Sequence, residues 1–203
     1  MSDQNRIAGR DAGGGLILIT GGVRSGKTSL AERLAEGAGS KVTYIATMEP
    51  LDDEVRERIR AHKAHRPPHW TTVEEPLAVP EAIAAHGSES DAIVVDCLGL
   101  WVSNILLRQS DETPYSERCE EIVSKVRVLA ETACGTRARV IVVSNEVGAG
   151  LVPESLLGRL FRDAMGWSNQ VLAAKASRVF LTVAGIPLDI KALASTLGEE
   201  AHR

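Results

Sequence analysis

One short motif limits the possible folds of this chain more than any other feature. Residues 21–28 read GGVRSGKT, which fits the pattern G-x-x-x-x-G-K-[S/T]. An apolar run at residues 16–20 precedes the motif, and a helical pattern at residues 28–38 follows it. In this order the glycines let backbone N–H groups turn toward a phosphate at the positive end of a helix. The motif therefore predicts a phosphate-binding loop, with a chance glycine-rich turn as the alternative.

Further apolar runs predict the sheet that carries this loop. They are short, continuous and rich in β-branched residues, at 42–46, 92–96, 140–144 and 179–183. Continuous rather than alternating runs indicate strands that are covered on both faces. Helical patterns lie between them at 52–65, 116–132 and 156–176. Strands that alternate with helices predict a three-layer α/β/α sandwich of the P-loop NTPase type, with a mainly parallel, RecA-like sheet.

Length and composition narrow the class of protein. We expect residues 1–14 to be a loose N-terminal extension and residues 15–203 to form one domain. The net charge of −4 offers no general attraction to nucleic acid. The chain has neither an apolar stretch long enough for a membrane span nor a secretory signal, so a cytoplasmic location is expected. Its three cysteines, which form no CxxC pair, are expected to be buried or half-buried thiols.

Three polar residues complete the predicted phosphate site. Lys27 adds a mobile positive charge to the loop, and the Thr28 hydroxyl is suited to bind Mg²⁺. Asp96 ends the apolar run at 92–96, where its carboxylate can hold the same ion directly or through a water molecule. The alternative for Asp96 is a helix-capping or loop aspartate. The sequence therefore predicts a nucleotide bound together with Mg²⁺.

A histidine on the second helical pattern is the other candidate for chemistry. Val55, Ile59 and His62 recur at spacings of four and three, so His62 lies on the apolar stripe of that helix. A histidine in that position is more often a hydrogen-bonded residue at the edge of a core than a catalyst. The residues alone therefore favour a structural His62.

Two functional alternatives compete with the structural one. Lys63 and Arg66 could stabilise a pentavalent phosphorus transition state beside a nucleophilic His62. A metal site made of His62, His65 and His69 is the other alternative, but Pro67-Pro68 separates His69 from the helix.

With these residues in place, the chain resembles the bifunctional adenosylcobinamide kinase and adenosylcobinamide-phosphate guanylyltransferase family of cobalamin biosynthesis. The resemblance spans about residues 16–191. It is carried, in order, by ILITGGVRSGKTSLAE, YIATMEPLDDEVRERIRAHKAHRPPHW, VVDCLGLWVSNIL, VVSNEVGAGLVPE and GRLFRDAMGWSNQVLAAKASRVFLTVAGIPLDIK. Ordinary small-molecule kinases share the first segment but not the others.

The resemblance implies two reactions in one chain. GTP or ATP phosphorylates the aminopropanol hydroxyl of adenosylcobinamide, and GMP is then transferred from GTP to that phosphate to give adenosyl-GDP-cobinamide. The family's GMP–histidine intermediate falls on His62, which reverses the structural interpretation above; Lys27 is the other catalytic residue. The resemblance also implies a homo-oligomer, commonly a trimer. The rival hypotheses are a single-activity kinase with a structural His62, and an ATP-driven motor or recombinase-like module.

The resemblance also assigns nucleotide contacts. They fall on Gly21, Gly22, Val23, Arg24, Ser25, Gly26, Lys27, Thr28, Ala46, Thr47, Met48, Lys63, Ala64, His65, Arg66, Glu74 and Asp96. This chain departs from the family pattern at Val23, where alanine is common, and at Gly99, where a hydroxyl residue is common; His65 lies at a position that varies.

Some later residues keep two interpretations. Asn145 and Glu146 follow the apolar run at 140–144, where open α/β sheets place ligands, so they either face the substrate or form a turn with a helix cap. Trp101 and Trp167 could stack on a corrin or a base, but burial in the core is expected for both.

Overall fold

A single mixed sheet organises the molecule. The computed structural model describes residues 14–49, 57 and 66–194. Its strands are β1 (Gly15–Gly21), β2 (Val42–Ala46), β3 (Thr71–Glu74), β4 (Ala92–Asp96), β5 (Arg139–Val143), β6 (Arg178–Val183) and β7 (Ile186–Asp189). They form one seven-stranded sheet in the order β3-β2-β4-β5-β1-β6-β7. All neighbours pair in parallel except β6 and β7.

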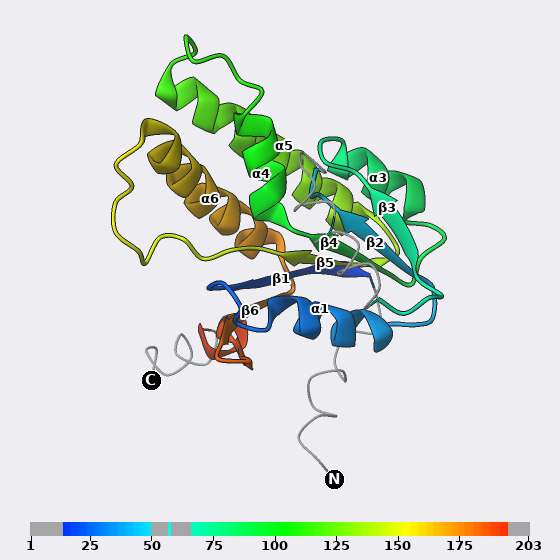
Figure 1. The fold of residues 1–203 in the computed structure, drawn as a ribbon. Coiled ribbons are helices and arrows are strands. Elements are labelled where there is room, and N and C mark those ends of the chain that lie inside the picture. Colours follow the sequence, from blue (N-terminus) through cyan, green and yellow to red (C-terminus); the bar gives the residue numbers. More distant parts are fainter. Residues whose placement is uncertain (1–13, 50–56, 58–65, 195–203) are drawn as a thin grey trace, which may run out of the picture.

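Helices cover both faces of this sheet. They are α1 (Lys27–Glu36), α3 (Val79–His86), α4 (Leu98–Leu106), α5 (Tyr115–Gly135) and α6 (Leu156–Lys175). Figure 1 shows α1 against one face and α3, α4, α5 and α6 gathered on the other. The predicted three-layer sandwich of the P-loop NTPase type with a mainly parallel sheet is confirmed. None of the helices in the described part of the chain is long and apolar enough to cross a membrane.

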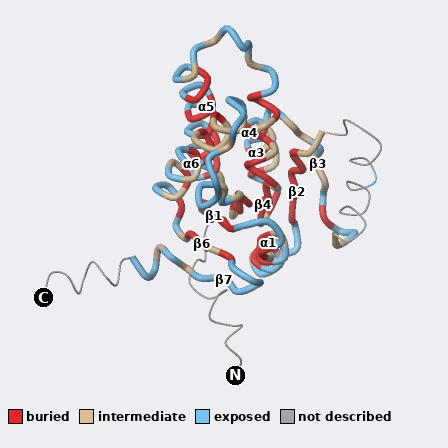
Figure 2. The backbone as a smooth tube through the Cα atoms, turned by 60° about the vertical axis from the view of Figure 1, so that its left-hand side comes forward, coloured by how far each residue is buried: buried red, intermediate tan, exposed pale blue. Residues whose placement is uncertain are grey.

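Alternation along the strands explains why two cores form. Leu16 and Leu18 of β1 pack in the cluster under α5 and α6, whereas Ile17 and Ile19 pack in the cluster under α1. Successive side chains of a strand point to opposite faces, so a strand covered on both sides must be apolar at every position. Figure 2 shows the result, with the central strands buried along their length and exposed residues concentrated at the periphery.

Sequence patterns found the buried strands and the long helices and missed the edge strands and the short helices. The predicted runs at 16–20, 42–46, 92–96, 140–144 and 179–183 all form strands, and the patterns at 28–38, 116–132 and 156–176 form α1, α5 and α6. Strands β3 and β7 were missed because neither contains a fully buried residue. Helices α3 and α4 were missed because, at 8 and 9 residues, they are too short to show a clear helical period. The predicted extension at 1–14 lies outside the described residues except for residue 14, and the predicted helix at 52–65 lies outside them except for residue 57.

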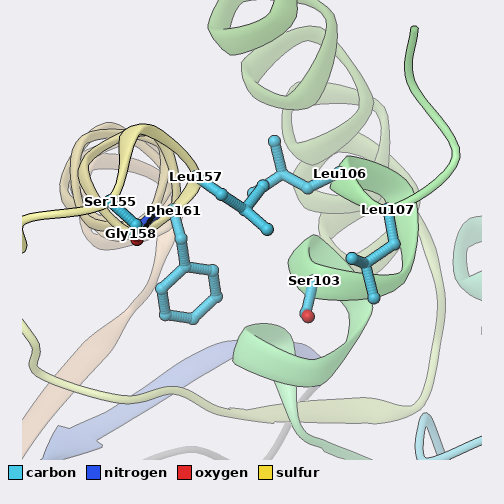
Figure 3. A pocket seen from close by; sticks show the side chains of 7 residues that line it. All are labelled: Ser103, Leu106, Leu107, Ser155, Leu157, Gly158 and Phe161. Carbon is cyan, nitrogen blue, oxygen red and sulfur yellow. Dashed lines mark hydrogen bonds between the residues drawn. The ribbon is translucent and has the colours of Figure 1, made fainter. Parts of the chain in front are cut away.

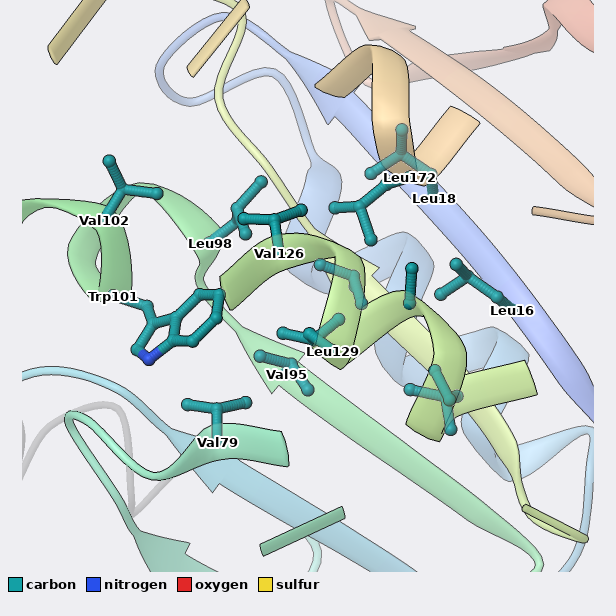
Figure 4. Packing of buried hydrophobic residues seen from close by; sticks show 14 of the residues in the cluster. Leu16, Leu18, Val79, Val95, Leu98, Trp101, Val102, Val126, Leu129 and Leu172 are labelled. Atoms are coloured by element: carbon teal, nitrogen blue, oxygen red, sulfur yellow. The ribbon is translucent and has the colours of Figure 1, made fainter. Parts of the chain in front are cut away.

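The larger core lies between the sheet and α5. Figure 4 shows Trp101 of α4 packed near Val79, Val95 and Leu129. Trp101 is 1% exposed and its Nε1 donates to the carbonyl oxygen of Leu77 at 2.7 Å, so its expected core role is confirmed. Trp167 is 46% exposed, so the expectation of burial is wrong for this residue.

Adjacent residues of α5 test the contribution of this core to stability. Leu129 is fully buried and Val128 is 50% exposed. We expect Leu129→Ala to lower the free energy of unfolding by about 2–5 kcal/mol, because it leaves a cavity under the sheet. Val128→Ala should change it by less than about 0.5 kcal/mol. Urea unfolding of the two variants and the wild type measures both values, and equal losses would contradict the assigned orientation of α5.

Candidate functional site

The loop between β1 and α1 has the backbone shape that anion binding requires. Gly21 and Gly26 have φ angles of 153° and 95°, and Arg24 has a φ of 54°. A Cβ atom on Gly21 would collide with the carbonyl oxygen of Thr182, so a larger residue does not fit there. Helix α1 begins at Lys27, directly after the loop. The positive end of the helix therefore faces the same space as the loop N–H groups.

The β6–β7 hairpin supports this loop from the side. The hydroxyl groups of Ser25 and Thr182 are hydrogen-bonded at 2.7 Å, and the N–H of Gly185 donates to the Ser25 carbonyl oxygen at 3.0 Å. Ala184 and Gly185 have φ angles of 51° and 81°, as a tight two-residue hairpin turn requires. The edge strand that sequence patterns missed thus belongs to the hairpin that holds the phosphate loop in shape.

Lys27 lies inside the loop. Its Nζ donates to the carbonyl oxygens of Gly21 at 3.0 Å and Gly22 at 2.7 Å. The residue is 8% exposed, and this burial lowers the pKa of Lys27, while Cys97 and Asp96 oppose the shift. Among the described residues, the hydrogen-bond acceptors of the ammonium group are neutral carbonyls. A phosphate oxygen in their place would form a stronger, charge-assisted hydrogen bond.

Asp96 joins two strands and the phosphate loop. Its Oδ2 accepts hydrogen bonds from Thr28 Oγ1 at 3.1 Å and from the hydroxyl of Tyr44 at 2.5 Å. Burial, followed by the Asp96 carboxylate, raises the pKa of Tyr44 far above its usual range, so the phenol stays a neutral donor. The guanidinium of Arg66 lies 3.7 Å from the centre of the Tyr44 ring. Tyr44 was missed from the sequence because a tyrosine inside an apolar strand looks like an ordinary core residue.

A hydrogen-bonded network fixes the ends of β2 and β4 beside this carboxylate. The N–H of Cys97 donates to Thr47 Oγ1 at 2.8 Å, and the Thr47 N–H donates to the Asp96 carbonyl oxygen at 3.2 Å. Asn104 Nδ2 donates to the carbonyl oxygens of Thr47 at 2.8 Å and Pro76 at 3.1 Å. The predicted contact residue Thr47 is fully buried. It therefore affects the site by holding the ends of β2 and β4 in place.

The segment after β5 lies next to the phosphate loop. The N–H of Glu146 donates to the Gly21 carbonyl oxygen at 3.0 Å. Ser144 Oγ donates to Asn169 Oδ1 at 2.5 Å, and Asn169 Nδ2 donates to the Asn145 carbonyl oxygen at 3.2 Å. Asn145 and Glu146 both line the cavity described next. The interpretation that they face a ligand is therefore favoured over a simple turn.

These elements enclose a cavity of about 500 Å³ at the carboxyl edge of the sheet. Of the predicted contact residues, it is lined by Val23, Arg24, Lys27, Thr28, Ala46, Met48, Arg66, Glu74 and Asp96. The lining also contains Tyr44, Cys97, Leu100, Val143, Asn145, Glu146 and Val147, which were not among them. Gly21, Gly22, Ser25, Gly26 and Thr47 shape the loop and strand ends around it. The predicted residues His62, Lys63, Ala64 and His65 lie outside the described residues.

Two departures from the family pattern have visible places in the site. Val23 is 90% exposed, so its larger side chain extends into solvent at the tip of the loop. A Cβ atom on Gly99 would lie 2.9 Å from Asn145 Nδ2. The Asn145 amide therefore occupies space that the side chain of a hydroxyl residue at position 99 would need.

A second cavity of about 310 Å³ lies between α4 and α6. Figure 3 shows Leu157 of α6 pointing toward Leu106 of α4 across this space. Its described lining is uncharged and consists of Ser103, Leu106, Leu107, Ser155, Leu157, Gly158 and Phe161. Without a charged group it does not suit a phosphate, so the cavity at the sheet edge is the better nucleotide site of the two.

The described residues contain no cluster of three or more His, Cys, Asp or Glu side chains that could hold a metal ion by themselves. A site made by Thr28 and Asp96 together with nucleotide oxygens is of a different kind, because most of its ligands arrive with the substrate. The histidine alternative rests on His62 and His65, which lie outside the described residues.

Comparisons with known proteins give one consistent result. Residues 17–190 match the family CobU, described as cobinamide kinase / cobinamide phosphate guanyltransferase. The bifunctional adenosylcobalamin biosynthesis protein CobP of Pseudomonas aeruginosa is 42% identical over 174 residues, covering 86% of this chain and 96% of that protein. The bifunctional adenosylcobalamin biosynthesis protein CobU of Escherichia coli is 42% identical over 181 residues, covering 87% and 99%.

A solved structure from Pyrococcus horikoshii resembles the fold. It has a TM-score of 0.53 and 10% sequence identity, and the match covers 93% of this chain and 91% of that one. At this identity the likeness concerns the fold alone.

The thiol that lines the cavity gives a chemical test of its environment. Burial, followed by the neighbouring Asp96, raises the pKa of Cys97 to about 11, so at pH 8 it holds roughly 100-fold less thiolate than an ordinary cysteine. Cys134 is exposed, contrary to the expectation of buried or half-buried thiols. We expect iodoacetamide at pH 8 to label Cys134 while Cys97 stays unmodified, with Cys97 labelling increasing as the pH approaches 11. Peptide mass spectrometry measures both, and equal labelling at pH 8 would contradict this environment.

Proposed function

The chain belongs to the cobinamide kinase / cobinamide phosphate guanyltransferase family, and from this premise we propose that both of its reactions use the cavity at the sheet edge. The protein is a bifunctional transferase of cobalamin biosynthesis, a cobinamide kinase and a guanylyltransferase. The observation that carries the proposal is the convergence of Lys27, Thr28 and Asp96 on one cavity directly behind a phosphate loop. We take residues 15–203 as the single domain that performs both steps.

In the kinase step, GTP or ATP binds with its phosphates on the loop at residues 21–28. Loop N–H groups and Lys27 Nζ hold the phosphates, and Lys27 exchanges the Gly21 and Gly22 carbonyls for phosphate oxygens. The aminopropanol hydroxyl of adenosylcobinamide is the acceptor. Catalysis of phosphoryl transfer is mainly positioning and charge stabilisation, which a preformed loop and a buried lysine supply.

Thr28 and Asp96 are suited to hold Mg²⁺ with the nucleotide. A hydroxyl and a carboxylate are the hard oxygen ligands that this ion prefers, and here they lie 3.1 Å apart. Bound there, Mg²⁺ would neutralise charge on the nucleotide phosphates. Tyr44 keeps the Asp96 carboxylate turned toward Thr28 through its own hydrogen bond to Oδ2.

In the guanylyl step, His62 is the proposed nucleophile. A ring nitrogen attacks the α-phosphorus of GTP, the bond to the bridging oxygen breaks, and pyrophosphate leaves. An oxygen of adenosylcobinamide phosphate then attacks the same phosphorus, the N–P bond breaks, and adenosyl-GDP-cobinamide forms. The proposal rests on the family resemblance of the R-I-x-x-H-K motif. The thiol of Cys97 is no substitute nucleophile, because its raised pKa keeps it protonated at neutral pH.

The remaining assignments rest on the same resemblance. The other nucleotide contacts are Ala46, Thr47, Met48, Lys63, Ala64, His65, Arg66 and Glu74. We propose a homotrimer that works in the cytoplasm, where its GTP and ATP substrates are present. Membership of this family argues against the motor or recombinase-like alternative. The single-activity kinase is the alternative that the next experiment tests.

Replacing the two catalytic residues should separate the two activities. We expect His62→Ala to lower guanylyl transfer more than about 1,000-fold, because the covalent intermediate cannot form, while phosphorylation stays measurable. Lys27→Ala should lower both activities about 100-fold or more, because both use the same phosphate site. Each activity is measured separately, and [α-³²P]GTP with Mg²⁺ measures acid-labile, base-stable labelling of the protein.

The matched control is His69→Ala, which removes an exposed histidine beyond the proline pair. It should keep both activities and the covalent label. A single-activity kinase with a structural His62 predicts the opposite pattern, with no covalent label in the wild type. Equal loss of both activities in a folded His62→Ala protein would contradict the proposal that His62 serves guanylyl transfer alone.

Removing one phenol oxygen tests the proposed cation site. We expect Tyr44→Phe to weaken the apparent Mg²⁺ affinity of the protein–nucleotide complex by about 10-fold, because Asp96 loses the donor that orients it. Calorimetric Mg²⁺ titrations with a non-hydrolysable GTP analogue measure this without turnover. Tyr115→Phe is the control, since Tyr115 donates to Asp163 at 2.8 Å away from the cavity. Unchanged affinity in Tyr44→Phe would remove Tyr44 from the cation site.

A further inference from the structure

The kinase step needs a group that takes the proton of the attacking hydroxyl. An alcohol is a weak nucleophile, and kinases place a carboxylate where it can accept that proton during phosphoryl transfer. Three carboxylates of the described residues line the cavity: Glu74, Asp96 and Glu146. Their positions in the sheet distinguish them.

Glu146 lies directly beside the phosphate loop. Strand β5 pairs with β1, so the segment that leaves β5 runs next to the segment that leaves β1. The Gly21 carbonyl oxygen accepts from the Glu146 N–H and from Lys27 Nζ, both at 3.0 Å. Glu146 and the lysine that would hold the terminal phosphates are therefore anchored to one atom. This places the Glu146 backbone at the phosphate end of the cavity, and its side chain lines that cavity.

The other two carboxylates are placed for different tasks. Asp96 ends β4, which β5 separates from β1, and its Oδ2 already accepts from Thr28 and Tyr44. Glu74 ends β3, the edge strand with three strands between it and β1. Of the three residues, Glu146 is the one whose backbone is hydrogen-bonded to the loop backbone in the described part of the chain.

The Glu146 side chain is held in place yet keeps an acceptor atom for the substrate. Its Oε1 accepts from the Gly148 N–H at 2.6 Å. Oε2 has no hydrogen-bond partner among the described residues, and the residue is exposed to the cavity. A carboxylate oriented through one oxygen and open at the other is what a base for an incoming hydroxyl requires.

We propose that Glu146 is the general base of the kinase step, an inference that rests on the proposed function. Its carboxylate accepts the proton of the cobinamide hydroxyl as the hydroxyl oxygen forms a bond to the γ-phosphorus. The bond from that phosphorus to the β,γ-bridging oxygen breaks, and GDP or ADP leaves with the electron pair. Guanylyl transfer to preformed adenosylcobinamide phosphate needs no such base, because its acceptor is already an anion.

The test compares Glu146→Gln with the wild type in two separate reactions. Transfer of ³²P from [γ-³²P]GTP to adenosylcobinamide should show a kcat lowered about 100-fold or more, with the KM for GTP changed by less than about threefold. Guanylyl transfer to purified adenosylcobinamide phosphate should stay within about threefold of the wild type. This second reaction shows that the variant is folded and binds nucleotide.

Two further variants sharpen the result. Glu146→Asp keeps a carboxylate on a shorter arm and should recover part of the kinase rate. Glu154→Gln changes an exposed glutamate of the same loop that does not line the cavity and should leave both reactions unchanged.

Kinase activity of Glu146→Gln near the wild-type rate would overturn the assignment. Equal loss of both reactions would also overturn it, because Glu146 would then be a structural residue of the loop. Failure of the proposed function has a different signature: wild-type protein would transfer no phosphoryl group to adenosylcobinamide, and the assignment would be withdrawn with it.

Discussion

Parallel pairing of β1 with β5 on one side and β6 on the other is the constraint on which the rest of the site depends. It brings the segments that leave these three strands to the same edge of the sheet. The phosphate loop, the segment with Glu146 and the β6–β7 hairpin therefore become neighbours, although they are far apart in the sequence. The register is held because Leu18 and Ile19 belong to different cores, and a slip of one residue would exchange them.

Neighbouring elements hold the phosphate loop in shape. The Thr182 hydroxyl and the Gly185 N–H hold Ser25, while the Glu146 N–H and Lys27 share the Gly21 carbonyl. Each of these bonds joins the loop to another element or to itself, so little conformational freedom remains to be lost on binding. Prior ordering of this kind lowers the entropic cost of holding a nucleotide in a reactive position.

The breadth of the cavity suits two attacks on one nucleotide. Its lining runs from Glu146, beside the phosphate loop, to Glu74 on the far edge strand, with Asp96 between them. A γ-phosphorus near the loop and an α-phosphorus further along can then be approached by different groups. Because β5 lies between β1 and β4, the carboxylate that we propose for the cation and the proposed base belong to separate strands. Two chemistries can share one set of phosphate contacts in this arrangement.

The sequence by itself determined the phosphate loop, the buried strands and the polar partners Lys27, Thr28 and Asp96. These follow from local requirements, since only glycine tolerates the loop backbone at Gly21 and a continuous apolar run must be covered on both faces. The function came from motifs spread along the chain, and the proposed role of His62 still rests on them.

Only the tertiary structure decided the rest. Strands β3 and β7 have no fully buried residue, and their existence depends on the strands that they pair with. Tyr44 looks like a core residue until the fold sets its hydroxyl against Asp96. Glu146 keeps two interpretations, a substrate-facing residue or a turn residue, until β5 sets it beside Gly21. Such roles depend on which side chains meet across the sheet. Local propensity and periodicity do not predict these contacts, because burial and hydrogen-bond partners are set only when the strands pair.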